Sequence, residues 1–162
     1  MQQPDALQFV EAMDKKIDYQ QSRGYLDIVQ RSTVPSGTKT IQAVWSFKRK
    51  CYPDGTLNNH KAWLCAHGGM QQWGVSCWET YSPVVNMLTV CLLLTLCNMH
   101  GLEFKSIDFI LVFPQADLDV DIWLELPTGT VVSGKDNESR AYVLKLEKSL
   151  YGLKQASLKW FK

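Results

Sequence analysis

The sequence lacks most of the features that mark a specialised class of protein. Its 162 residues carry 17 Lys and Arg against 16 Asp and Glu, so the basic signature of many free-standing nucleic-acid binders is absent. Five cysteines without paired close spacing exclude a disulfide framework and favour a reducing compartment. No Gly-rich phosphate loop occurs, and the N-terminus shows neither a basic nor an apolar stretch, so we expect no secretion signal. What remains, 46% hydrophobic and 20% charged residues, predicts an ordinary globular chain of single-domain length.

The near-neutral total hides a partition of charge along the chain. Residues 106–126 hold five acids and no Lys or Arg, whereas residues 45–61 hold four cations against Asp54. Residues 145–162 hold five lysines against Glu147. Such a partition is expected if metal-binding carboxylates face a polyanion held by lysines. Solvated surface charge is the alternative explanation, and the charge pattern alone favours it.

Local patterns predict an α+β fold. Residues 4–17 have the apolar stripe of a helix, with Pro4 in its first turn. Residues 41–66 have the pattern of a β-hairpin around the turn Tyr52-Pro53-Asp54-Gly55. The other predicted elements are strands at 117–125 and 142–146, a polar loop at 131–140, and a helix from about residue 154 after a turn at Tyr151-Gly152.

A long apolar run predicts a helix from Ser82, as N-cap, and Pro83 to the stop signal at Gly101. Because the run is apolar on nearly every side, we expect a helix buried on most faces. A membrane span is the alternative, but polar residues interrupt the run and it is shorter than a span requires, so we expect no membrane association.

Asp108 is the candidate chemical group, in the middle of a predicted strand at 102–113. An unpaired carboxylate in such an apolar setting needs a cation or hydrogen-bond donors. Mg²⁺ would supply the cation, since it takes one or two carboxylates together with phosphates and water. Backbone N–H groups at a strand end would serve as well, and the residues alone leave both interpretations open.

Two Cys/His groups raise the question of a transition-metal site. Their spacings, Cys65-x-His67 and Cys91-x5-Cys97-x2-His100, do not match the usual zinc-ligand patterns. We therefore interpret these cysteines as small hydrophobic residues.

Five segments, in order, resemble the copia-type reverse transcriptase of LTR retrotransposons. The most specific are Lys148-Ser149-Leu150-Tyr151-Gly152-Leu153-Lys154-Gln155-Ala156 and Glu79-Thr80-Tyr81-Ser82-Pro83-Val84. The other three are Pro35-x-Gly37-x-Lys39-x-Ile41 with Trp45-Ser46-Phe47-Lys48-Arg49-Lys50, the turn Tyr52-Pro53-Asp54-Gly55 with Lys61-Ala62-x-Leu64, and Ile107-Asp108 with Phe113.

The resemblance implies the fingers and part of the palm of a right-hand polymerase, ending before the second catalytic motif. It implies a single partial domain over 1–162: an N-terminal helix and lead-in to about residue 34, a fingers hairpin and loop over about 35–81, and a palm portion over about 82–162. It further implies an RNA template, a DNA primer and a deoxynucleoside triphosphate, with Mg²⁺ as cofactor. The resemblance also implies that the chain belongs to a Pol polyprotein with integrase and RNase H. It implies an intracellular, cytoplasmic location in virus-like particles.

The family's functional residues map onto matching positions. By resemblance, Asp108 would ligate the catalytic metals and Phe109 would offer its backbone carbonyl. Phe113 would stand where an aromatic gate excludes a ribose 2′-OH, and Lys61 would meet the triphosphate. The remaining residues implied at the nucleotide or the nucleic acid are Tyr151, Gly152, Lys48, Arg49, Lys50 and Lys154.

Several departures distinguish this sequence from the family pattern. Trp63 and Cys91 stand where the family carries arginines, and Leu111-Val112 replaces Thr-Ala before the aromatic gate. The two arginine replacements suggest, as a hypothesis, a decaying element copy. The 162 residues hold no Asp-Asp pair, whereas the family's second metal site is a Tyr-x-Asp-Asp turn. We therefore expect this chain alone to be inactive.

Two alternatives to a polymerase fragment follow from the same residues. Basic segments interleaved with Trp45, Phe47, Trp160 and Phe161 suit a non-catalytic nucleic-acid-binding or interaction module left by a decayed element. A chain that does not fold stably, because its sheet lacks partner strands, is the other.

Overall fold

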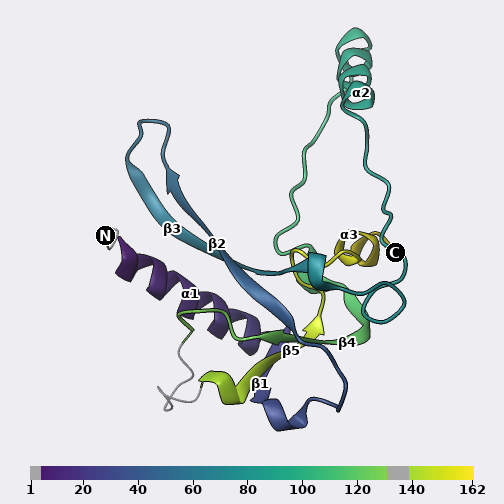
Figure 1. Ribbon diagram of the computed structural model, residues 1–162. Coiled ribbons are helices and arrows are strands. Elements are labelled where there is room, and N and C mark those ends of the chain that lie inside the picture. The colour runs from purple at the N-terminus through teal and green to yellow at the C-terminus, as the bar shows by residue number, and fades with distance from the viewer. Residues whose placement is uncertain (1–4, 131–138) are drawn as a thin grey trace.

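The computed structural model describes residues 5–130 and 139–162 (Figure 1). Its elements are α1 (Ala6–Ser22), β1 (Leu26–Gln30), η1 (Arg31–Thr33), β2 (Ile41–Cys51), β3 (Leu57–Ala66), η2 (Gly68–Met70), α2 (Met87–Met99), η3 (Phe113–Gln115), β4 (Asp117–Glu125), η4 (Ser139–Ala141), β5 (Tyr142–Lys148) and α3 (Ala156–Phe161). These strands form a five-stranded sheet in the order β1-β5-β4-β2-β3. The predicted α+β class is confirmed.

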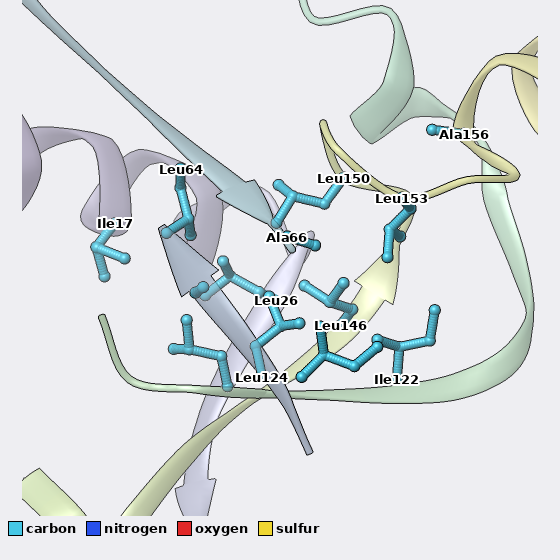
Figure 2. Packing of buried hydrophobic residues seen from close by; sticks show 13 residues of the cluster. Ile17, Leu26, Leu64, Ala66, Ile122, Leu124, Leu146, Leu150, Leu153 and Ala156 are labelled. Carbon is cyan, nitrogen blue, oxygen red and sulfur yellow. The ribbon is translucent and has the colours of Figure 1, made fainter. Parts of the chain in front are cut away.

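The core lies where the sheet meets α1 and the chain after β5. Leucines from four strands have no exposed surface: Leu26, Leu64, Leu124 and Leu144. Ile17 of α1 and Leu150, just after β5, belong to the same cluster (Figure 2). Fully burying a side chain of this size stabilises a fold by about 1.5–3 kcal/mol, so this cluster holds the sheet together.

The predicted hairpin at 41–66 is confirmed. β2 and β3 pair in antiparallel register from Ala43 opposite Ala66 to the end at Cys51 and Leu57. Gly55, at φ +85°, provides the left-handed residue that the turn needs. β2 joins the rest of the sheet by a short parallel pairing with β4, so most of the hairpin extends away from the body (Figure 1).

The predicted N-terminal helix is confirmed and continues beyond residue 17 to Ser22, while Pro4 lies outside the described residues. Its first turn is fixed to the hairpin through Asp5, which accepts hydrogen bonds from Arg49 Nη2 at 2.7 Å and from His60 Nε2 at 2.9 Å. The Phe9 ring packs on Phe47 and on His60, with centroids 5.0 and 4.7 Å apart. α1 thereby braces β3, an edge strand of the sheet.

The Asp5 contacts give a pH dependence. Hydrogen bonds from Arg49 are the main reason that the pKa of Asp5 lies well below its ordinary value of 3.8. A lowered folded-state pKa means that this stabilisation is complete above about pH 4 and is lost as the pH falls towards the folded-state pKa. Asp5→Asn is therefore expected to lower the free energy of unfolding at pH 7 and to weaken its decline between about pH 5 and 2. Urea unfolding at several pH values measures both, and Asp14→Asn on the exposed side of α1 is the control; an unchanged acid decline in Asp5→Asn contradicts the assignment.

The long helix differs from its prediction at one end and in its surroundings. α2 begins only at Met87, because the side chain of Asn86 accepts a hydrogen bond from Leu88 N at 2.9 Å and so replaces Ser82 as the N-cap. Its predicted stop is confirmed: Gly101 has φ +63°, and Leu102 N donates to Cys97 O at 2.8 Å, as in a Schellman motif.

The prediction that this helix is buried is wrong for the described residues. Leu88 is 76% and Met99 71% exposed, and Cys91 is exposed as well. Two long arms carry α2 away from the body, so no described element covers it (Figure 1). No helix in the described part of the chain has the length and apolar character that crossing a membrane requires.

The predicted strand at 102–113 is also wrong. Residues 102–109 have no regular structure, and a turn and η3 follow them. A strand needs a hydrogen-bonding neighbour, and none of the described strands pairs with this arm. The strands predicted at 117–125 and 142–146, and the helix predicted from about residue 154, are confirmed as β4, β5 and α3. The predicted polar loop at 131–140 lies mostly outside the described residues.

Candidate functional site

The Tyr151-Gly152 turn packs directly against the end of β3. Ala66 N donates to Tyr151 O at 2.8 Å. A Cβ atom placed on Gly152 would lie 2.2 Å from Ala66 O, and one placed on Gly68 would lie 2.1 Å from Gly152 O. Gly152 also has φ +87°. Two glycines therefore allow two backbone segments, far apart in sequence, to touch without side chains between them.

Phe113 adjoins the same turn, and Asp108 lies five residues before it in the chain. The Phe113 ring lies edge-on to Tyr151, with centroids 4.9 Å apart. The pKa of the Tyr151 phenol is raised, mainly by burial and to a smaller extent by electrostatic interaction with Cys65 and Asp108. The structure thus brings together three of the residues predicted at the site, Phe113, Tyr151 and Gly152.

The environment of Asp108 differs from both of the environments predicted for it. Its side chain is exposed on the arm that returns from α2, and it accepts no hydrogen bond from the described residues. The Asp108 carboxylate is therefore neither buried nor capped by backbone N–H groups of the described residues. The neighbouring Phe109 ring packs edge-on to Trp160 of α3, at 5.6 Å between centroids, which ties the arm to the body.

The acidic strip that follows Asp108 has a structural role. On β4, Asp117 pairs with Lys148, Asp119 pairs with Lys159 at 2.8 Å, and Glu125 accepts from Arg31. The Arg31 hydrogen bonds lower the pKa of Glu125. For these three acids the simpler interpretation, surface charge, holds.

A single carboxylate fits Mg²⁺ only in part. Asp108 supplies an unoccupied hard oxygen donor of the kind that Mg²⁺ prefers. The described residues contain no group of three or more His, Cys, Asp and Glu that could hold a metal ion. The remaining ligands of a magnesium centre would have to come from other polypeptide, phosphates or water.

The predicted binding cations differ in whether another described residue already contacts them. Arg49 is engaged by Asp5, and Lys154 Nζ donates to Gln71 O at 3.1 Å. Lys48 and Lys50 are exposed on the hairpin and have no ion pair among the described residues. Lys61 is half-buried on β3 directly opposite Lys48, a like-charge pair that no described carboxylate compensates.

Two buried glutamines hold the site together, and sequence reasoning did not identify them as such. Gln71 Nε2 donates to Gln155 Oε1 at 2.9 Å, and both amides donate to Ser76 O. Lys154 N donates to Gln71 Oε1 at 2.8 Å. This network joins the loop after β3 to the segment after Tyr151-Gly152. Gln155 falls within the most specific motif, but nothing in the pattern around Gln71 indicates a buried side chain.

Comparison with known proteins assigns the family. A family model described as "Reverse transcriptase (RNA-dependent DNA polymerase)" matches residues 26–162. The chain is 35% identical over 158 residues to a retrovirus-related Pol polyprotein from transposon TNT 1-94 of Nicotiana tabacum, covering 98% of the chain and 11% of the relative. Retrovirus-related Pol polyproteins from transposons RE1 and RE2 of Arabidopsis thaliana are 33% and 30% identical, each covering 93% of the chain and 10% of the relative.

No solved structure matches the chain. The chain spans about a tenth of the length of these curated relatives. The match nevertheless covers most of the chain, including the arm with Asp108 and the Tyr151-Gly152 turn. The chain therefore belongs to the copia-type reverse transcriptase family.

Proposed function

We propose that the chain forms the fingers and part of the palm of an RNA-directed DNA polymerase. The observation that supports this proposal is the meeting of Phe113, five residues after Asp108, with the Tyr151-Gly152 turn at the end of β3. These residues come from separate segments, and nothing in local secondary structure requires them to meet. A polymerase requires such a meeting, because the metal ligand and the nucleotide-binding residues act on one substrate.

In this proposal each residue has a distinct task. Asp108, with the Phe109 carbonyl, would hold Mg²⁺, which when bound stabilises charge on the attacking and leaving oxygens. Phe113, fixed by its contact with Tyr151, would border the sugar and reject a 2′-hydroxyl. Lys61 would neutralise triphosphate charge, and Tyr151 with Gly152 would border the base and the template. The division into a lead-in, a fingers segment and a palm segment at about residues 34 and 81 remains a prediction.

Primer extension tests the proposal. A polypeptide of these 162 residues has no Asp-Asp pair and is expected to give no product. The completed domain, a fusion of the 162 residues to the polypeptide that follows the matching segment in the tobacco relative, is expected to extend a DNA primer on an RNA template with Mg²⁺. Extension by the 162 residues alone, or a folded but inactive completed domain, contradicts the proposal.

A non-catalytic nucleic-acid-binding module is the second candidate. Its support is Lys48 and Lys50, which are exposed on the projecting hairpin and have no ion pair among the described residues. This candidate is favoured if the chain binds an oligonucleotide while the completed domain folds and does not polymerise. Association with integrase and RNase H in a polyprotein, and a cytoplasmic location in particles, follow from the resemblance and remain predictions.

A further inference from the structure

A groove runs between α1 and β3. It has a volume of about 700 Å³, and its walls include Lys15 and Lys16 of α1 and Lys61 of β3. Ile110 and Leu111, which closely follow Asp108, also line the groove. The α1 wall lies outside residues 26–162, so the family match does not assign it a role.

Two of these lysines lack a compensating charge. Lys16 is half-buried, and no carboxylate pairs with it in the described part of the chain; its Nζ lies 5.9 Å from the centroid of the Tyr19 ring. Burial lowers the pKa of Lys16. Lys61 is likewise half-buried, and its cross-strand neighbour is another lysine, Lys48.

Seven other lysines and arginines among the described residues are paired with an acid. Those in ion pairs are Lys15, Arg31, Arg49, Lys145, Lys148, Lys159 and Lys162. Within the groove, the acid on the α1 wall, Glu11, lies 3.9 Å from Lys15, and both are exposed. Partial burial of an ammonium group is unfavourable unless an anion compensates it. The groove therefore has an excess of positive charge that the described residues do not neutralise.

We propose that the α1–β3 groove binds nucleotide phosphate groups, with Lys16 and Lys61 as its two cations. Phosphate carries the charge and the acceptor oxygens that two ammonium groups require. A nucleotide triphosphate and a single-stranded nucleic acid both present this group, and the groove lies beside the arm that bears Asp108. The inference rests on the proposed function and adds α1 to its binding surface.

Fluorescence anisotropy with a labelled oligothymidylate of about a dozen nucleotides tests the groove. For single strands, each phosphate contact contributes about 0.7 to the slope of log affinity against log salt. Lys16→Gln and Lys61→Gln are each expected to reduce the slope by about that amount and to weaken binding about fivefold at about 0.1 M salt. Lys39→Gln is the control, because Lys39 is exposed, outside the groove and unpaired among the described residues. Circular dichroism melts verify that all variants remain folded.

Competition by inorganic triphosphate and by thymidine triphosphate identifies the source of the phosphate. Displacement that depends on Lys16 indicates a free nucleotide, and loss confined to oligonucleotide binding indicates a strand; either supports the groove. Parental affinity in both groove variants, an equal loss in Lys39→Gln, or a parent chain that binds neither probe overturns it. The proposed function is decided separately, by primer extension with the completed domain.

Discussion

Asp108→Asn in the completed domain is expected to reduce nucleotide incorporation by at least about a thousandfold. The substitution retains the shape of the side chain and removes the negative charge that a magnesium ion requires. Metal stabilisation of transition-state charge contributes several kcal/mol, and about 4 kcal/mol corresponds to a thousandfold change in rate. Because Asp108 is exposed and accepts no hydrogen bond from the described residues, the melting temperature is expected to stay unchanged. Single-turnover incorporation and a thermal melt measure the two effects.

Asp119→Asn is the matched control for this experiment. Asp119 lies on the same acidic strip, but its carboxylate pairs with Lys159 at 2.8 Å on the surface of β4. Loss of an exposed ion pair costs about 0.2–1 kcal/mol of stability, and we expect incorporation to stay within about twofold of the parent. A loss below tenfold in Asp108→Asn, or equal losses in the two variants, contradicts the role proposed for Asp108.

Gly152→Ala is expected to lower the free energy of unfolding of the chain by about 3 kcal/mol or more. The new methyl group would lie 2.2 Å from Ala66 O, a backbone atom that cannot move without displacing the end of β3. The residue would also have to keep φ +87°, which an L-amino acid adopts only with strain. Both costs are present, so we expect the turn to separate from β3. Urea unfolding measures the loss.

Gly55→Ala separates the two contributions. Gly55 has a nearly identical φ of +85°, but no atom lies within 4 Å of a Cβ placed there. Its substitution therefore costs only the backbone term, about 1–2 kcal/mol. Similar losses in the two variants would show that the contact between the turn and β3 contributes little.

Local sequence signals predicted the elements whose formation depends on residues within the same short segment. The Tyr52-Pro53-Asp54-Gly55 turn predicted the hairpin because turn chemistry and strand pairing act on the same short segment. Alternation of acid and apolar residues predicted β4, whose outward acids contact lysines. Gly101 predicted the end of α2, because a left-handed C′ residue is a local requirement.

Properties that depend on distant residues could not be predicted in this way. The helix beginning at Met87 is apolar all round, a pattern typical of a buried helix, yet no described element covers it. The arm at 102–109 has strand-like composition, but strand formation depends on a neighbour rather than on composition. The parallel pairing of β2 with β4 has no signal in either strand.

The candidate site also contains residues that a local motif predicted and residues whose position depends on distant parts of the chain. The resemblance identified Tyr151 and Gly152 because their motif is contiguous, and the structure places them beside Phe113. Lys16 has no such motif: a lysine next to the buried Ile17 on an amphipathic helix is expected to face water, and its position beside the groove depends on how α1 packs on β3.

The two arms of α2 link the helix to the position of Asp108. One arm bears Asp108, so any polypeptide that covers the helix must also restrain the arm on which that carboxylate stands (Figure 1). Burial of the exposed apolar helix and restraint of this carboxylate are therefore coupled.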